Sequence, residues 1–269
     1  MTRVVAALSG GGAKAAAHVG AVRALSEVGL TPARYVGTSM GAVIGAGFAC
    51  GLKPDEVLAR ITEAGRTGIV RSIFAPLGGL YLASLMRPEP LRRAFEWLLP
   101  AQRFADLSLP LTVTATDLDS GELVLFGDGG RDVPLIDALM ASSALPLFFP
   151  AVTIDGRRYG DGGLRGVVPL EPAARGEVDL IVAVDIGPGF DELATAPSSY
   201  PSLVRAHNDA TGILMAANTA LQLSLWRSDP TRPKLVYVRP AVERHATFRV
   251  ERADAYAAEG YRATREALG

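Results

Sequence analysis

The stretch RYVGTSMGAVIG, residues 34–45, decides the fold. A short β-type run at 35–36 leads into a motif of the form G-x-S-x-G, which places a serine on a sharp turn between a strand and a helix. Glycines 37 and 41 flank Ser39 and relieve the crowding around such a turn. We therefore predict a nucleophile elbow at Ser39, followed by a buried helix over 40–50.

Working outward from this elbow, short apolar runs alternate with segments of helical periodicity. This alternation predicts a three-layer α/β/α sandwich with a mostly parallel central sheet, formed by one domain over residues 1–269. An Asp155-Gly156 turn indicates a hairpin. Strands are expected at 4–8, 35–36, 111–115, 123–126, 152–154, 158–159, 180–185 and 235–238, and helices at 13–28, 40–50, 53–64, 135–144, 202–226 and 252–268.

The composition is that of an ordinary globular protein. Of 269 residues, 49% are apolar and 20% are charged, and the formal net charge is −1. A near-neutral balance gives no support for a nucleic-acid surface, which needs a basic field. The single cysteine, Cys50, lies in an apolar run and is expected to be a buried, inert thiol.

No segment reads as a signal peptide or as a membrane span of roughly 18 apolar residues. We therefore expect a cytoplasmic protein whose contact with a membrane, if it has one, is peripheral. Arginine greatly outnumbers lysine, which suggests a GC-rich coding sequence and points weakly to a bacterium. The oligomeric state is left open.

Glycines dominate a second segment, Gly10-Gly11-Gly12-Ala13-Lys14, which lies between a predicted strand and a predicted helix. Backbone N–H groups in such a loop can approach an anion closely. A nucleoside triphosphatase loop is disfavoured because Ala15, not serine or threonine, follows Lys14. A dinucleotide loop, an oxyanion hole and a plain tight turn all remain compatible with the segment.

Aspartates mark two further turns. Asp161 precedes Gly162-Gly163, a pattern that alone favours a turn. Asp117 and Asp119 are two possible metal ligands, but no further ligand cluster accompanies them, so a turn is preferred there too.

Together, these segments resemble the patatin-like phospholipases. The resemblance rests on GGGAK at 10–14, GTSMG at 37–41 and DGG at 161–163, in the family's order. Supporting matches are AHVGAVRAL at 17–25, TATDLDSGE at 114–122 and ASSALPLFFP at 141–150, so the motifs span about 4–170. The chain departs from the pattern at Ala15, where the family usually has glycine, and at Val168, where it often has asparagine.

The resemblance implies a Ser–Asp dyad that hydrolyses acyl esters of phospholipids, lysophospholipids or related lipids through an acyl-enzyme, without metal or other cofactor. Ser39 would be the nucleophile and Asp161 the base, with the lipid substrate as the main partner. The remaining implied site residues are Gly10, Gly11 and Gly12 for the oxyanion hole, Gly37 and Gly41 for the elbow, and Lys14, Gly162 and Gly163 in support.

Other interpretations stay open. A conventional Ser-His-Asp triad would need one of the three histidines, His18, His207 or His245. A catalytically weak lipid-binding or scaffold protein on the same fold, and a nucleotide-binding protein using the glycine loop, are further alternatives. The apolar and amphipathic segment at about 73–100 either contacts lipid, as a groove or lid, or packs into the core.

Overall fold

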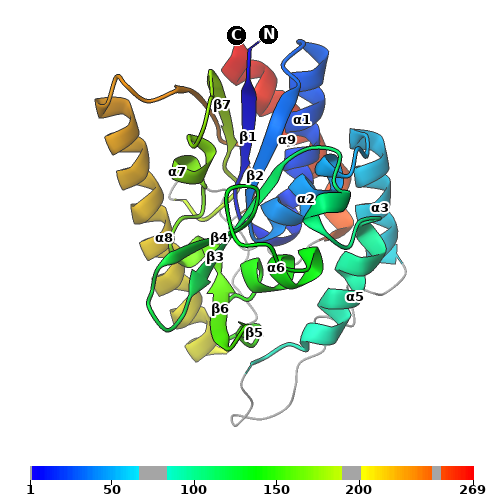
Figure 1. The fold of residues 1–269 in the computed structure, drawn as a ribbon, viewed down its shortest axis with the longest axis vertical. Coiled ribbons are helices and arrows are strands. Elements are labelled where there is room, and N and C mark those ends of the chain that lie inside the picture. The colour runs from blue at the N-terminus through cyan, green and yellow to red at the C-terminus, as the bar shows by residue number, and fades with distance from the viewer. Residues whose placement is uncertain (1, 67–83, 190–200, 244–249) are drawn as a thin grey trace.

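The computed structural model describes residues 2–66, 84–189, 201–243 and 250–269. Within these ranges an eight-stranded sheet runs through the middle of the molecule in the order β5-β6-β3-β2-β1-β7-β8, with β4 paired to β3 (Figure 1). The strands are β1 (Val4–Leu8), β2 (Pro32–Thr38), β3 (Leu111–Asp117), β4 (Leu123–Gly127), β5 (Val152–Ile154), β6 (Arg157–Asp161), β7 (Leu180–Val184) and β8 (Lys234–Val238).

The central strands are parallel. β1 pairs in parallel with β2 and β7, β2 with β3, and β7 with β8. Every residue of β1 and of β7 is buried, because helices cover both faces of the sheet. This explains why both strands are continuous apolar runs rather than alternating ones.

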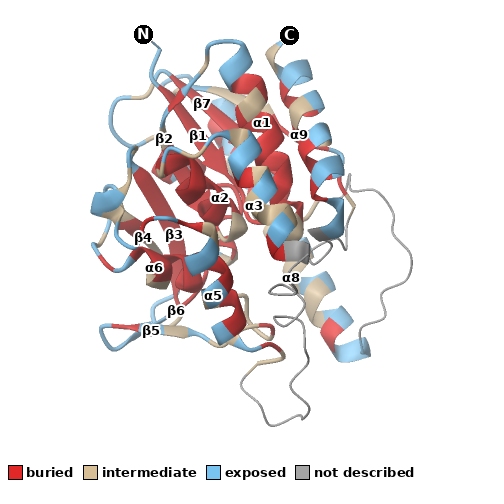
Figure 2. Ribbon diagram, turned by 90° about the vertical axis from the view of Figure 1, so that its right-hand side faces the viewer, coloured by how far each residue is buried: buried red, intermediate tan, exposed pale blue. Residues whose placement is uncertain are grey.

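Two helical layers enclose the sheet. On one face, Val4, Ala6 and Leu8 of β1 share a buried cluster with the larger helical layer; on the other, Val5 and Ala7 pack with α7 and α8. Figure 2 shows the buried residues concentrated on the sheet and on the inward sides of the helices. The helices are α1 (Ala16–Glu27), α2 (Met40–Ala49), α3 (Pro54–Arg66), α5 (Pro88–Leu98), α6 (Leu135–Ser142), α7 (Leu170–Ala173), α8 (Ser202–Ser228) and α9 (Ala253–Leu268).

One edge of β3 is shared by two strands. β2 pairs with β3 from Leu111 to Thr114, in parallel, and β6 pairs with β3 from Ala115 to Asp117, antiparallel. β4 overlaps both stretches and therefore occupies the opposite edge. The last residue of β2 and the last residue of β6 consequently lie beside consecutive residues of β3, with their chains arriving from opposite directions.

The three-layer α/β/α architecture with a mostly parallel sheet is confirmed. Element positions agree closely with the predictions, although β2 is longer than 35–36 and a 3-10 turn at Gly12–Ala15 precedes α1. The short helix α7 was not predicted. α5 occupies part of the 73–100 segment, and Leu91 and Phe95 of α5 are buried in the core, as the packing alternative expects. Residues 73–83 of that segment lie outside the described residues.

Two glycines allow helices α1 and α9 to touch backbone to backbone. A Cβ added to Gly20 would lie 1.8 Å from the carbonyl oxygen of Ala257, and one added to Gly260 would lie 1.9 Å from that of Ala17. Such distances are far below van der Waals contact, so no side chain fits without separating the helices.

Gly260→Ala is therefore expected to destabilise the fold by about 1–3 kcal/mol, because the obstructing atoms are backbone and cannot rotate away. Gly47→Ala in α2 is the matched control. A Cβ at position 47 would lie 3.4 Å from Val57, which is an ordinary contact. The higher helix propensity of alanine should therefore raise the free energy of unfolding by about 1 kcal/mol. Urea unfolding of the two variants checks this; equal stabilities would contradict the packing argument.

Candidate active site

Ser39 lies on a strained turn between β2 and α2. Its backbone has φ 52° and ψ −129°, a left-handed conformation that is rare for a residue with a side chain. The flanking glycines permit this geometry. A Cβ on Gly37 would lie 2.3 Å from Cα of Ala42, and one on Gly41 would lie 2.3 Å from the carbonyl oxygen of Ser9. The predicted elbow therefore has the tight geometry that its glycines implied.

A hydrogen bond from the backbone of Ser39 fixes the turn. Its N–H donates to Oγ of Ser142, the last residue of α6, at 2.7 Å. Ser142 is fully buried. Sequence reasoning assigned Ser142 no role, although it lies in the ASSALPLFFP match.

Asp161 ends β6, and its side chain meets Ser39. The carboxylate is buried, lies close enough to the Ser39 hydroxyl for that group to affect its pKa, and accepts a hydrogen bond from the Gly163 N–H at 2.7 Å. Burial raises the pKa of Asp161 from 3.8 to about 6, and the neighbouring Ser39 hydroxyl and Gly163 N–H oppose this rise without cancelling it. The structure thus brings together the two residues that the resemblance pairs, and gives the carboxylate an enhanced affinity for a proton.

Strand register explains this meeting. Thr38, directly before the nucleophile, is paired with Thr114, and Asp161 is paired with Ala115, the next residue of β3. Gly162 passes so close to β3 that a Cβ there would lie 2.4 Å from Oγ1 of Thr114. The glycine after Asp161 is a packing requirement of the site.

The glycine loop borders Ser39. A Cβ on Gly10 would lie 3.2 Å from Cβ of Ser39. The N–H of Gly10, however, donates to the carbonyl of Val167 at 3.2 Å, so this amide is engaged in the fold. This revises the expectation of three donors in the loop. Gly11 and Gly12 supply the N–H groups at the start of the 3-10 turn that make no bond to a described residue.

The two departures from the family pattern fit the structure. Ala15 is buried and has φ −56° and ψ −19°, which is helical and suits any L-residue. Val168 is buried in the apolar cluster under α7 and α8. Lys14 is also buried, on the turn that follows the glycines.

Buried polar contacts hold the loop from behind. Oγ of Ser9 accepts the Ile186 N–H at 2.8 Å and donates to the Gly10 carbonyl at 3.1 Å. Asp185, also buried, accepts hydrogen bonds from the Gly187 N–H at 2.8 Å and the Tyr237 hydroxyl at 2.6 Å. The Ser9 contacts tie the segment after β7 to the glycine loop, and the Tyr237 contact ties it to β8; no sequence motif pointed to them.

Neither of the two described histidines, His18 and His207, is hydrogen-bonded to Ser39. His18 is fully buried, its Nε2 donates to the Ser9 carbonyl at 2.9 Å, and burial lowers its pKa to about 4. This supports the structural role expected for it. His207 lies half-buried on α8, and His245 lies outside the described residues.

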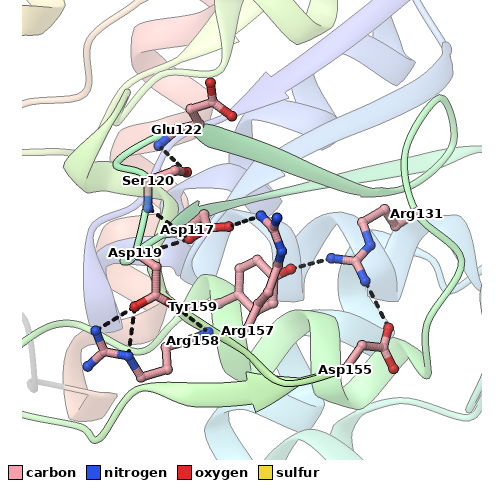
Figure 3. A network of polar contacts seen from close by, with 9 residues as sticks. All are labelled: Asp117, Asp119, Ser120, Glu122, Arg131, Asp155, Arg157, Arg158 and Tyr159. Carbon is pink, nitrogen blue, oxygen red and sulfur yellow. Dashed lines mark hydrogen bonds and ion pairs between the residues drawn. The ribbon is translucent and has the colours of Figure 1, made fainter.

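Asp117 and Asp119 belong to a network of ion pairs, shown in Figure 3. Asp117 closes the β3–β4 turn by accepting N–H groups of Asp119 and Ser120, and it pairs with Arg157 at 2.7 Å. Asp119 pairs with Arg158 at 2.6 Å. The turn role is confirmed, and no cluster of metal-ligating side chains is found among the described residues. The network clamps the β5–β6 hairpin, which carries Asp161, to the β3–β4 turn.

A serine on a strained strand-to-helix elbow, beside a buried carboxylate and a glycine loop, places the chain among the α/β proteins built around a nucleophile elbow. A family model described as patatin-like phospholipase matches residues 6–174. The chain therefore belongs to the patatin-like phospholipase family, and the resemblance seen in its motifs is confirmed.

Individual relatives agree with this assignment. An NTE family protein of Mycobacterium tuberculosis is 34% identical over 184 residues, which cover 68% of this chain and 49% of that protein. Human omega-hydroxyceramide transacylase is 32% identical over 167 residues, covering 60% of this chain and 30% of that protein. The chain thus spans half or less of these relatives. The crystal structure of VipD from Legionella pneumophila shares the fold, with a TM-score of 0.50 at 16% identity, over 99% of this chain and 66% of that one.

The Ser142 contact generates a test with a neighbouring control. Ser142→Ala removes the acceptor of the Ser39 N–H, which is expected to lower stability by about 1–3 kcal/mol and to slow labelling of Ser39 by a fluorophosphonate. The hydroxyl of Ser143 is buried without a hydrogen-bond partner among the described residues, so Ser143→Ala should be neutral or stabilising. Equal effects of the two variants in unfolding and labelling would show that the bond does not hold the elbow.

Proposed function

We propose that this protein hydrolyses acyl esters of phospholipids, lysophospholipids or related lipids, using Ser39 as nucleophile and Asp161 as general base. The observation that carries the proposal is the strand register that sets Ser39, on a strained elbow, beside Asp161, a buried carboxylate whose pKa is raised to about 6. Family membership supports lipid acyl chemistry for the chain, and the proximity of Ser39 and Asp161 supports their proposed roles.

In the first half of the reaction, the ionised Asp161 accepts the proton of the Ser39 hydroxyl while Oγ bonds to the carbonyl carbon of the ester. The carbonyl oxygen becomes an oxyanion, and the N–H groups of Gly11 and Gly12 are the donors proposed to hold it. The N-terminus of α2, which begins at Met40, adds favourable potential. The tetrahedral intermediate then expels the alcohol, which takes the proton from Asp161 and leaves an acyl-enzyme.

In the second half, Asp161 accepts a proton from water, and the resulting hydroxyl bonds to the acyl carbon. Collapse of this intermediate breaks the bond to Ser39 Oγ, which recovers its proton from Asp161, and a carboxylic acid is released. A carboxylate is ordinarily a weak base for a serine. Burial of Asp161 makes it a stronger one, because desolvation disfavours its ionised form.

A triad with histidine has less support. His18 uses Nε2 to bond the Ser9 carbonyl, and burial keeps its imidazole neutral above about pH 4. Membrane contact is proposed to be peripheral; among the helices that the structure describes, none is both long and apolar enough to cross a bilayer.

Ser39→Ala is expected to abolish covalent labelling by a fluorophosphonate and to reduce hydrolysis of a short-chain nitrophenyl ester by about 10³-fold or more. Ser228→Ala, at an exposed serine at the end of α8, is the control and should label normally. Full labelling of the Ser39 variant would overturn the nucleophile assignment. If the Ser39 variant loses labelling but the wild type hydrolyses neither the ester nor any lipid, the lipid-binding alternative is favoured.

The pH profile tests the base. Below about pH 6 Asp161 is protonated and cannot accept the serine proton, so kcat/KM should fall as the pH decreases through about 6 and level off above it. Asp161→Asn should remove most of the activity, and His207→Ala should leave the inflection in place. The measurement is kcat/KM for the nitrophenyl ester across about pH 4.5–8.5. An active Asp161 variant together with an inactive histidine variant would replace the dyad by a triad.

A further inference from the structure

Buried threonines line one face of the sheet next to the candidate active site. Thr112, Thr114 and Thr116 occupy every second position of β3, so their side chains point to the same face, and all three are buried. Thr38, the last residue of β2, is fully buried and is paired with Thr114. Strands β1 and β7 of the same sheet consist entirely of apolar residues. Hydroxyl groups at this depth need hydrogen-bond partners within the protein.

Thr38 and Thr114 form a directed chain of hydrogen bonds. Their Oγ1 atoms lie 2.8 Å apart, and Thr38 Oγ1 donates to the carbonyl oxygen of Gly166 at 3.4 Å. A hydroxyl has one proton to donate, so Thr114 is the donor in the pair and Thr38 is the acceptor. The chain therefore runs from β3 through β2 to the loop that follows Asp161.

The Thr38 side chain borders each part of the candidate site. Its backbone continues directly into Ser39, its hydroxyl bonds the loop after Asp161, and its Cγ2 would lie 3.8 Å from a Cβ on Gly10. The loop after Asp161 also holds Gly10, because the Val167 carbonyl accepts the Gly10 N–H at 3.2 Å. One buried side chain thus lies between the segments that carry the nucleophile, the proposed base and the proposed oxyanion donors.

We propose that Thr38 is a positioning residue, whose hydroxyl fixes the loop after Asp161 relative to the Ser39 elbow; this role rests on the proposed function of Ser39 and Asp161. Strand register sets the backbone only as far as the ends of β2 and β6. Beyond those ends, the bond from Thr38 to Gly166 ties the loop back to β2. Reacting groups misplaced by about 1 Å can lose about 10²-fold in rate, so this tie bears on the reaction.

The other two threonines of β3 separate this role from ordinary packing. Thr116 donates to the Asp161 carbonyl at 2.9 Å and so bonds the strand that carries the carboxylate. Thr112 donates at 2.7 Å to the carbonyl of Asp128, directly after β4. Thr112 therefore shares the strand, the face and the burial of Thr114 but bonds a segment outside the site, which makes it the matched control.

The test compares loss of the hydroxyl with loss of the methyl group at position 38. Thr38→Val keeps the shape of the side chain and removes the donor to Gly166, whereas Thr38→Ser keeps the hydroxyl and removes the methyl near Gly10. The measurement is kcat for the nitrophenyl ester per active site, with sites counted by fluorophosphonate labelling. It should fall about 10–100-fold in Thr38→Val and stay near the wild-type value in Thr38→Ser. KM should change little in either variant, because the side chain is fully buried.

Variants of β3 test the same chain from its other end. Thr114→Val removes the hydroxyl that holds Thr38 and should also lower kcat, and the double variant should fall no further than the sum of two independent losses would require. Thr112→Val should lower the free energy of unfolding in urea, since it leaves the Asp128 carbonyl without this donor, and should leave kcat unchanged.

The role of Thr38 and the proposed function fail in different ways. If the wild type shows Ser39-dependent turnover, but Thr38→Val and Thr114→Val keep the kcat of Thr112→Val, the role of Thr38 alone is overturned. A wild type without Ser39-dependent turnover would refute the proposed function and this role with it. Should Thr38→Val not fold, Thr114→Val decides, because it removes the same bond between the strands and leaves the elbow sequence intact.

Discussion

Two strands that end against the same edge of β3 place the candidate site. β2 runs in parallel along the first part of that edge and β6 arrives from the other direction, so their last residues stand next to each other. Backbone hydrogen bonds, rather than flexible side chains, thereby set the separation of Ser39 and Asp161. A shift of β6 by one residue would turn Asp161 to the other face of the sheet, because side chains alternate along a strand.

Much of this architecture could be predicted from local patterns. Continuous apolar runs such as Val4–Leu8 identified the buried strands, and the glycines around Ser39 identified the elbow. The rest depends on residues far apart in the chain. Asp-Gly-Gly at 161–163 looks like any turn until β3 is beside it, so the family resemblance alone singled it out. The four-residue helix α7 is too short to show a period.

The same limit applies inside the site. The three loop glycines look alike in the sequence. Only the fold reveals that the Gly10 N–H donates a hydrogen bond to the Val167 carbonyl. Ser142 is one serine of a pair, and its neighbour Ser143 is also buried, yet only Ser142 accepts the Ser39 N–H. Such roles follow from which backbone groups happen to need a partner.

Burial acts on two titratable groups of the site in opposite directions. It raises the pKa of Asp161, whose charged form is an anion, and lowers that of His18, whose charged form is a cation. Burial therefore makes the Asp161 carboxylate a stronger base and keeps the His18 imidazole neutral above about pH 4. The same physical effect favours a proton on Asp161 and disfavours one on His18, which lies close to the glycine loop.

The placement of Asp161 on a late hairpin also has a consequence for the order of folding. The elbow, the glycine loop and β1 are encoded near the N-terminus, whereas Asp161, the proposed base, arrives only after β3 and the β5–β6 hairpin have been made and paired. Closing this long loop is among the slower events of folding. A growing or partly folded chain thus holds Ser39 without Asp161 beside it, and the candidate site is completed together with the sheet.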